Sequence, residues 1–429
     1  MDLADDVVAA CHAPRGVAGS IRVPASKSLT QRALLASALA GPGSTVHNPL
    51  NAEDPRLLFE ALHKVGFRLV WEGDAITAHG REAVAGASLL LGNNGTGVRF
   101  LLAQLAALPG TWVVDGSQRL RERPLAPLVT ALRTLGARID PVEGVADVLP
   151  LRVHGQPLRG GRVEVDASVS SQFVSALLLL GATLRDGLEV RLTAPPPSRP
   201  YVELTVEVLS AFGAPPVAAD EGRTWKIRGA GLAPTEFAVE GDWSAAAFPL
   251  AAAAVAGGRV EVVGVRRGSR QGDATVLEML ARAGCRAVES PRGVVLEGPA
   301  TAPLEADLRD TPDLFPPLAV VVAAVGGRLT GLGRLATKES DRLAVMTGRL
   351  GALGFAVEAG VHWFARSAEA RPGGSAGTPL DPAADHLVAM ALAVAGCVVP
   401  GVVVSNPGCV AKSWPGFWDA WRGIVPAER

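Results

Sequence analysis

The chain has 429 residues, of which 48% are hydrophobic and 49 are glycine. That length exceeds what one hydrophobic core usually supports, so we expect two domains. The 41 lysine and arginine residues balance 42 acidic residues, which excludes a global field suited to nucleic acid or to an anionic membrane surface. The apolar runs are short and broken by glycine, and the chain does not open on a basic segment followed by an apolar one. We therefore expect a cytoplasmic protein with no membrane partner.

The cysteines indicate neither a metal site nor a disulfide framework. They are scattered along the chain and lack the close pairing that a zinc or iron–sulfur site requires. We expect each of them to pack as a small, reduced, apolar residue. They are Cys11, Cys285, Cys397 and Cys409.

A first recurring element is an apolar run rich in alanine and leucine, closed by a glycine and followed by a β-branched stretch. This pattern predicts a buried helix, a glycine stop and a strand. It occurs at Ala33–Ala40, Phe100–Leu108, Phe173–Leu180, Phe248–Ala256, Phe315–Val325 and His386–Ala395.

A second recurring element lies between these runs and predicts an amphipathic helix followed by a hairpin. It occurs at Leu57–Gly66, Leu128–Gly136, Leu204–Gly213, Val276–Gly284 and Met346–Gly354. The repeat length of about 70 residues indicates a duplicated supersecondary unit. We predict an α/β fold of two similar domains that close over an interdomain cleft, each with three helix/strand units around buried central helices. The predicted boundaries are 22–239 for the first domain and 1–21 plus 240–429 for the second.

The junction Val23–Arg32 joins a strand-like run to the first apolar helix. Ser26, Lys27 and Ser28 would place backbone N–H groups, hydroxyls and an ammonium at a helix start, which suits a phosphate or carboxylate. Arg32 adds a forked cationic donor. The alternative is that Ser26 is an ordinary N-cap and that Lys27 and Arg32 are solvated.

Similar clusters precede other helices in the first half. Gly92–Arg99 offers glycines and donors for an anion, but its glycine order excludes the dinucleotide pattern. Asp166–Gln172 offers hydroxyls and an amide at a helix start. Arg119–Pro124 is basic, and Ser198–Tyr201 holds a ring that can stack on a cyclic substrate. Capping turns and a solvated loop are the alternative interpretations.

The second half supplies acids as well as bases. Asp313 precedes the fifth apolar helix, and Lys338 and Arg342 share one helical face, where an anion would relieve their repulsion. If the repeats are arranged alike, the helix starts converge on one face of each domain. The resulting cleft favours a small molecule with several negative charges, and Asp313 and Glu339 are candidates for proton transfer. Its cations would be Lys27, Arg32, Arg123, Lys338, Arg342 and Lys412.

These motifs resemble those of the enolpyruvyl transferases and, more narrowly, of the EPSP synthase family. The match runs in order over nearly the whole chain. It rests on Ser26-Lys27-Ser28 with Arg32, Gly92-Asn93-x-Gly95-Thr96 with Arg99, Arg121-Glu122-Arg123-Pro124, Ser170-Ser171-Gln172, Lys338-Glu339-Ser340-Asp341-Arg342 and Lys412-Ser413-Trp414-Pro415.

The resemblance implies transfer of the enolpyruvyl group of phosphoenolpyruvate to the 5-hydroxyl of shikimate 3-phosphate, with release of phosphate and with glyphosate as a competing inhibitor. It implies small-molecule partners, no metal and no organic cofactor, and we expect a monomer. The first domain would mainly hold shikimate 3-phosphate and the second mainly phosphoenolpyruvate.

The resemblance also implies roles for individual residues. Proton transfer would fall to Asp313, Glu339 and Lys27. The shikimate 3-phosphate contacts would be Lys27, Ser28, Arg32, Ser170, Ser171, Gln172, Ser198, Tyr201, Asp313 and Lys338. The phosphoenolpyruvate contacts would be Lys27, Asn93, Gly95, Arg123, Gln172, Arg342 and Lys412.

The chain departs from the family pattern at a few positions. Leu387 stands where the family usually has an arginine that helps to hold phosphoenolpyruvate, and Ala336 also replaces an arginine. Two alternatives follow from Leu387: a relative with an altered acceptor, and a binder of phosphorylated ligands that does not turn them over.

Overall fold

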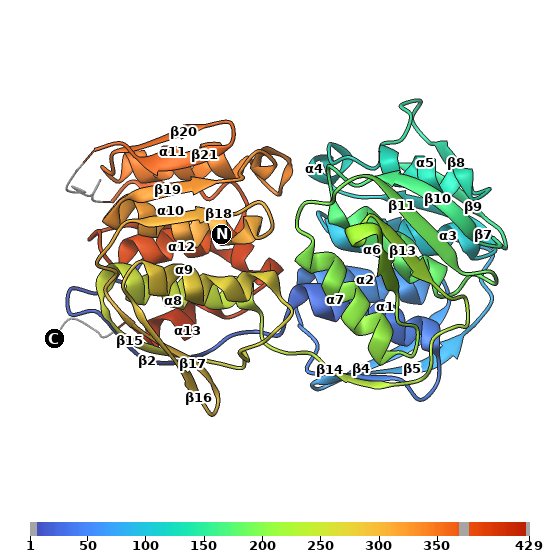
Figure 1. Cartoon of the computed structure of the whole chain (residues 1–429), viewed down its shortest axis with the longest axis horizontal. Coiled ribbons are helices and arrows are strands. Elements are labelled where there is room, and N and C mark those ends of the chain that lie inside the picture. The colour runs from blue at the N-terminus through green and yellow to red at the C-terminus, as the bar shows by residue number, and fades with distance from the viewer. Residues whose placement is uncertain (1–6, 369–376, 426–429) are drawn as a thin grey trace. The chain divides into compact units, whose positions relative to one another are not determined.

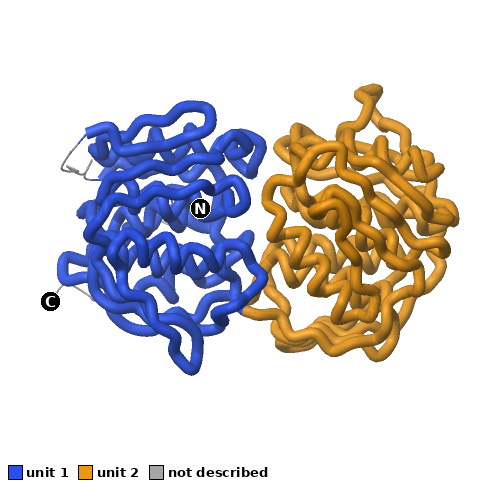
Figure 2. Tube along the Cα trace, viewed as in Figure 1, with its two compact units in different colours: residues 1–24, 241–429 blue, residues 25–240 orange. Residues whose placement is uncertain are grey.

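The computed structural model describes residues 7–368 and 377–425, and Figure 1 shows its helices and strands. The chain divides into two compact units (Figure 2). Unit 2 is Ala25–Glu240, and unit 1 combines Met1–Pro24 with Gly241–Arg429. The predicted boundaries at residues 22 and 239 lie beside these division points. Each unit has its own hydrophobic core.

Unit 2 alternates helices and strands along the chain. Its helices are α1 (Lys27–Ala40), α2 (Glu53–Lys64), α3 (Gly95–Ala107), α4 (Gln118–Arg121), α5 (Ala126–Thr134), α6 (Ser171–Gly181) and α7 (Pro200–Ala211), with the 3₁₀ turn η2 (Asp220–Gly222). Its strands are β3 (Thr45–His47), β4 (Phe67–Glu72), β5 (Ala75–Arg81), β6 (Gly86–Leu90), β7 (Gly110–Asp115), β8 (Arg138–Pro141), β9 (Leu151–Gly155), β10 (Gly161–Asp166), β11 (Leu188–Ala194), β12 (Val217–Ala219), β13 (Thr224–Ile227) and β14 (Glu236–Ala238).

Unit 1 follows the same alternation. Its helices are α8 (Trp243–Ala256), α9 (Val276–Arg282), α10 (Phe315–Val325), α11 (Arg342–Ala352), α12 (His386–Gly396) and α13 (Phe417–Arg422). Its 3₁₀ turns are η3 (Gly272–Thr275), η4 (Pro312–Leu314), η5 (Leu335–Thr337) and η6 (Pro407–Lys412). Its strands are β1 (Val7–Ala9), β2 (Val17–Arg22), β15 (Gly258–Val263), β16 (Arg286–Ser290), β17 (Gly293–Gly298), β18 (Leu304–Asp307), β19 (Gly327–Thr330), β20 (Val357–Gly360), β21 (Trp363–Arg366), β22 (Pro379–Leu380) and β23 (Val403–Ser405).

One repeat shows the common plan. Strands β6 and β7 pair in parallel, and the buried helix α3 makes the crossover between them, as a parallel pair requires. The amphipathic helix α5 then leads into the hairpin β8–β9, and the sheet order is β6-β7-β9-β8. Across the described residues this four-stranded order recurs in five sheets, so the predicted repeat is confirmed for them.

The sixth sheet differs from the other five. In the described residues it has three strands in the order β1-β23-β22, and no hairpin follows α13. The N-terminal strand β1 instead pairs antiparallel with β23, from Val7 opposite Ser405 to Ala9 opposite Val403. The backbone groups along that side of β23 are therefore satisfied by the start of the chain.

The chain changes units just after a strand, at two places. Strand β2 precedes α1 of unit 2, yet it pairs in parallel with β15 of unit 1. Strand β14 precedes α8 of unit 1, yet it pairs in parallel with β3 of unit 2. The division points after Pro24 and Glu240 thus leave each of these strands in the sheet that it completes.

Buried helices form the centre of each unit. Helices α1, α3 and α6 in unit 2, and α8, α10 and α12 in unit 1, are buried along most of their length. Full burial of one leucine or valine contributes roughly 1.5–3 kcal/mol, so these helices account for much of each core. Within residues 7–368 and 377–425, no helix is long and apolar enough to cross a membrane.

The predicted glycine stops are partly wrong. Gly41, Gly257 and Gly326 follow their helices with positive φ, as expected. Gly181 and Gly396 instead belong to α6 and α12. Glycine is required there for close packing, because an added Cβ would lie 2.5 Å from Ile227 Cγ2 in the first case and 2.4 Å from Ala10 Cβ in the second.

A glycine at or just after the end of the hairpin lies against the chain at or just beyond the end of the central helix in several repeats. An added Cβ would lie 1.8 Å from the Leu108 carbonyl oxygen at Gly155, 1.6 Å from that of Leu184 at Gly229, and 1.8 Å from that of Ala253 at Gly298. These are backbone atoms that cannot rotate away. The hairpin therefore approaches the helix end as closely as it does because the position has no side chain.

We predict that Gly155→Ala lowers the free energy of unfolding of unit 2 by roughly 2–4 kcal/mol, because either the hairpin or the end of α3 must move. Urea unfolding followed by circular dichroism would measure it. The matched control is Gly144→Ala in the β8–β9 turn, where an added Cβ meets nothing within 4 Å and φ is +74°; it should cost only about 1 kcal/mol of backbone strain. Equal losses in the two variants would contradict the packing argument.

Candidate active site

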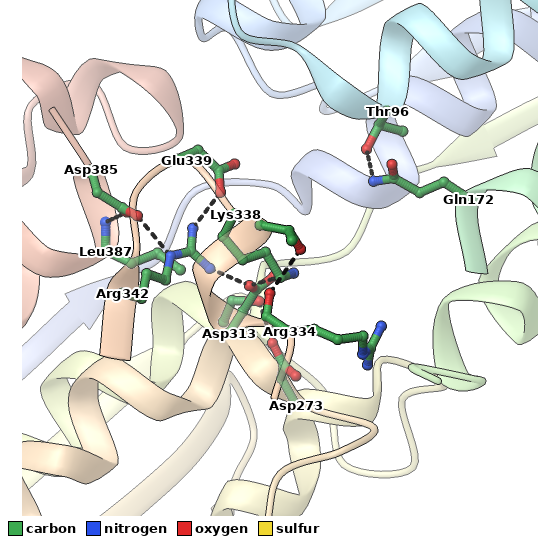
Figure 3. Close-up of polar contacts among 12 residues, drawn as sticks. Thr96, Gln172, Asp273, Asp313, Arg334, Lys338, Glu339, Arg342, Asp385 and Leu387 are labelled. Carbon is green, nitrogen blue, oxygen red and sulfur yellow. Dashed lines mark hydrogen bonds and ion pairs between the residues drawn. The ribbon is translucent and has the colours of Figure 1, made fainter. Parts of the chain in front are cut away.

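In unit 2 the starts of several helices lie together, as the repeat predicted for each domain. Lys27, the first residue of α1, places its Nζ 3.3 Å from Asp54 Oδ2 in the first turn of α2. Asn94, the N-cap of α3, donates to the Asp54 carbonyl at 2.7 Å. Gln172 in the first turn of α6 donates to Thr96 in the first turn of α3 at 2.8 Å (Figure 3).

Arg32 is buried inside unit 2. Its Nε donates to Thr205 at 2.8 Å, and Nη1 and Nη2 donate to the carbonyls of Ser28 and Tyr201. Burial lowers the pKa of Arg32 to about 10, with a smaller opposing effect from Tyr201. The guanidinium therefore links α1 to α7 by hydrogen bonds and positions Ser28 and Tyr201. Its direct contact with a substrate stays a prediction.

Arg123 has the features of an anion-binding residue. Its side chain is buried, and among the described residues its Nε and Nη1 atoms have no hydrogen-bond partner. A buried guanidinium without partners is costly, and an anionic ligand would remove that cost. Gly95 leaves room for the Arg123 guanidinium, because an added Cβ at residue 95 would lie 2.4–2.6 Å from the guanidinium atoms.

Arg99 holds the neighbouring groups in place. Its Nη1 donates to the Gly95 carbonyl at 2.7 Å and to Gln172 Oε1 at 2.9 Å, and its Nη2 donates to the Pro124 carbonyl at 2.7 Å. The same side chain thus fixes the starts of α3 and α6 and the loop that carries Arg123. The sequence indicated Arg99 only as an additional donor, whereas its contacts make it a positioning residue.

The remaining predicted residues of unit 2 also lie at helix starts. Ser170 is the N-cap of α6 and accepts from the Gln172 amide at 3.2 Å. Ser171 follows it and is buried. Ser198 has φ of +57° just before α7, and Tyr201 is in the first turn of that helix. Asn93, half-buried, directly precedes the N-cap of α3.

In unit 1 the buried side chain of Arg342 is surrounded by carboxylates (Figure 3). Its Nε donates to Asp385 at 2.7 Å, and its Nη2 donates to Glu339 at 2.7 Å. Its Nη1 donates to Asp313 Oδ1 at 2.6 Å. Burial alone would lower the pKa of Arg342, but Asp385, Glu339 and Asp313 together raise it above its ordinary value.

Lys338 completes this cluster and corrects one expectation. Its Nζ lies 3.3 Å from the same Asp313 Oδ1 that Arg342 contacts. The sequence predicted that Lys338 and Arg342 share one helical face, but α11 begins at Arg342 and Lys338 lies outside it, at the end of η5. The anion predicted to relieve their repulsion is Asp313, which contacts both. Burial lowers the pKa of Lys338, and Asp313 opposes this effect. Asp313 is thus a carboxylate held by two cations.

Asp385 is a central residue that sequence analysis did not select. It is fully buried, and its Oδ2 accepts from Ser340 at 3.0 Å as well as from Arg342. Its Oδ1 caps α12 by accepting from the Leu387 amide at 3.1 Å. The Leu387 side chain is buried in the core of unit 1. An acid at the start of an apolar helix was the only signal, and it is common to ordinary caps.

Two other buried polar groups belong to unit 1. Lys412 is buried at the end of η6. Asp273 in η3 is buried and accepts a hydrogen bond from Ser244 in the first turn of α8.

Among the described residues, no group of three or more histidine, cysteine, aspartate and glutamate side chains is arranged to hold a metal ion.

Comparison with known proteins gives the family. The family profile of EPSP synthase (3-phosphoshikimate 1-carboxyvinyltransferase) matches residues 11–421. The chain belongs to the EPSP synthase family. The 3-phosphoshikimate 1-carboxyvinyltransferase of Syntrophobacter fumaroxidans is 38% identical over 423 residues, covering 95% of this chain and 97% of its own. The enzyme of that name from Methanoculleus marisnigri is 37% identical over 414 residues, covering 93% and 95%.

Solved structures agree with this assignment. An EPSP synthase from Acinetobacter baumannii superimposes with a TM-score of 0.78 at 26% identity, covering 99% of each chain. The enolpyruvyl transferase NikO from Streptomyces tendae gives a TM-score of 0.77 at 19% identity, over 98% of this chain and 97% of its own, and shows the shared fold. The predicted α/β fold and the predicted family are confirmed.

We predict that Asp385→Asn lowers the free energy of unfolding of unit 1 by roughly 3–5 kcal/mol, because Arg342 stays charged and buried with one carboxylate fewer. Asparagine retains a capping oxygen, so the loss reports the ion pair more than the cap. Chemical denaturation would measure it. Asp341→Asn, at the exposed N-cap of α11, is the control and should cost less than about 1 kcal/mol. A loss at Asp385 no larger than the control's would refute the argument.

Proposed function

We propose that this protein transfers the enolpyruvyl group of phosphoenolpyruvate to the 5-hydroxyl of shikimate 3-phosphate and releases phosphate. The observation that carries the proposal is the buried guanidinium of Arg123, with unpaired nitrogens beside Gly95. A small, highly charged anion suits such a position. Membership of the EPSP synthase family supports phosphoenolpyruvate as that anion.

The substrate contacts follow from the helix starts. Lys27, Asn93, Gly95, Arg123 and Gln172 supply cations, amides and backbone N–H groups to phosphoenolpyruvate, with Arg342 and Lys412 from unit 1. The phosphate and hydroxyls of shikimate 3-phosphate are bound by Lys27, Ser28, Arg32, Ser170, Ser171, Gln172, Ser198, Tyr201, Asp313 and Lys338. Exposed N–H groups at helix starts favour anions, which supports both assignments.

The reaction needs a base and an acid. A base removes the 5-hydroxyl proton while the oxygen bonds to C2 of phosphoenolpyruvate, and an acid protonates the methylene carbon to give a tetrahedral ketal. A methyl proton is then removed as the C–O bond to phosphate breaks, which restores the enol double bond. Asp313, Glu339 and Lys27 are the proton carriers of this proposal. Lys338 and Arg342 both contact Asp313 Oδ1 and hold this carboxylate in position.

Leu387 does not lead us to a different function. Its side chain packs in the hydrophobic core of unit 1, and no observation favours an altered acceptor or a binder without turnover.

The proposal includes a cytoplasmic monomer. The separate hydrophobic cores of the two units support the monomer, since each unit can bury its apolar surface without a second copy of the chain.

Phosphate release is the decisive experiment. Purified protein should release phosphate from phosphoenolpyruvate when shikimate 3-phosphate is present and not when it is absent. Asp313→Asn and Glu339→Gln should bind shikimate 3-phosphate within about tenfold of the wild type, while kcat falls about 10²-fold or more. No acceptor-dependent release by the wild type would refute the function. Near-normal turnover in either variant would remove that residue from proton transfer.

We predict that Gly95→Ala raises the KM for phosphoenolpyruvate about tenfold or more, because the new methyl group displaces the Arg123 guanidinium. The KM for shikimate 3-phosphate should change by less than about threefold, and steady-state kinetics in both substrates would show the difference. Arg123→Lys, which keeps the charge but loses the planar fork, should have the same selective effect. An equal rise in both KM values would indicate general damage to the start of α3 and contradict this prediction.

A further inference from the structure

Asp273 is a buried acid with incomplete hydrogen bonding. Its side chain is 3% exposed. One carboxyl oxygen, Oδ2, accepts from the Ser244 hydroxyl, whereas Oδ1 is buried and has no hydrogen-bond partner among the described residues. Gln271 fixes the turn that carries it, because its side chain accepts from the Trp243 amide at 3.2 Å and donates to the Gly241 carbonyl at 2.8 Å. The carboxyl group is therefore held in place at the start of α8.

The internal repeat shows what Asp273 lacks. Asp54 holds the corresponding position in unit 2, in the first turn of α2, the helix that follows β3. Lys27 Nζ lies 3.3 Å from its carboxylate. Lys27 is the first residue of α1 after the N-cap Ser26, and the first residue of α8 after its N-cap Asp242 is Trp243. An indole replaces an ammonium. Asp273 thus occupies an equivalent buried position without a lysine at the start of the adjacent helix to favour its ionised form.

The charged groups around Asp273 come from several elements. Asp313 in η4 and Asp242 at the N-cap of α8 disfavour the ionised form of Asp273, and Lys338 after η5 favours that form. Burial is the largest influence, followed by Asp313, and together they raise the pKa of Asp273 to about 7 against the opposing hydrogen bond from Ser244. Figure 3 shows Asp273 close to Asp313.

We propose that Asp273 is a pH-responsive positioning residue: it exchanges a proton near neutral pH and, through its charge, sets how strongly Asp313 attracts a proton. When Asp273 is ionised, its negative charge makes Asp313 a better base toward the substrate hydroxyl. When Asp273 is protonated, Lys338 and Arg342 dominate the field at Asp313, which becomes a weaker base. The part of this proposal that concerns turnover rests on the proposed function.

The first test does not depend on catalysis. A carboxyl whose folded pKa lies above its ordinary value of 3.8 stabilises the fold at low pH, and this contribution is lost as pH rises through about 7. Because asparagine does not ionise, Asp273→Asn should lack this fall in stability with rising pH. The urea midpoint of the variant relative to the wild type should therefore rise between about pH 4 and pH 8. Asp419→Asn, at an exposed acid of the same unit, is the control for the substitution itself, and its effect on the urea midpoint should be small.

The second test uses turnover. Wild-type kcat should rise as Asp273 ionises, with a midpoint near pH 7. In Asp273→Asn that rise should be absent, kcat above the midpoint should fall about threefold to tenfold, and both KM values should stay within about twofold. Ser244→Ala removes the hydrogen bond that favours the ionised form, so it should move the midpoint to higher pH while keeping the carboxyl group. This variant also serves if Asp273→Asn does not fold.

The outcomes separate the two proposals. A difference in urea midpoint that is independent of pH would overturn the titration of Asp273, whatever the activity. A titrating Asp273 with an unchanged kcat profile in both variants would overturn its action through Asp313. Absence of acceptor-dependent phosphate release by the wild type would refute the proposed function, and the unfolding measurements would still decide whether Asp273 exchanges a proton near neutral pH.

Discussion

The start of a buried helix is the constraint on which this structure depends. Each apolar central helix satisfies its own backbone except at its ends, where the first N–H groups have no partner within the helix. Since these ends lie beside other helices inside a packed unit, side chains supply the missing acceptors in five of the six central helices. Ser26, Asn94, Ser170, Asp242 and Asp385 do so as N-caps. The exception, α10, has prolines without N–H groups in its first turn. Polar chemistry therefore gathers where the helices begin.

The two units meet this constraint in chemically different ways. Unit 2 places hydroxyls, amides and the incompletely paired guanidinium of Arg123 at its helix starts, which favours an incoming anion. Unit 1 surrounds Arg342 with the carboxylates of Asp313, Glu339 and Asp385, so the positive charge of Arg342 is already balanced within the unit. The first arrangement suits the binding of phosphate and carboxylate groups, and the second suits the movement of protons.

Divergence between repeats shows how such a difference arises from single positions. Lys27 and Trp243 begin equivalent helices, and each lies near an aspartate of the next helical element. With lysine, the two side chains form an ion pair, and the Asp54 carbonyl also accepts a hydrogen bond from Asn94 at the start of α3. With tryptophan, the aspartate loses its cation, and burial becomes the dominant influence on its ionisation. A duplicated fold can thus hold an ion pair at one copy of a position and, at another, a buried acid with one oxygen that has no partner among the described residues.

The sequence by itself determined the repeat, the buried helices and the family, because apolar periodicity, glycine placement and ordered motifs are local properties of the chain. Two features depended on the tertiary structure. The pairing of β2 with β15 and of β14 with β3 joins segments that are distant in sequence, and such pairing leaves no local signal. The partners of Asp313, Arg342, Asp385 and Asp273 were likewise hidden, since they come from turns and helices distant in sequence. An aspartate before an apolar helix has the same pattern whether it only caps that helix or also holds a buried arginine, and only packing distinguishes the two.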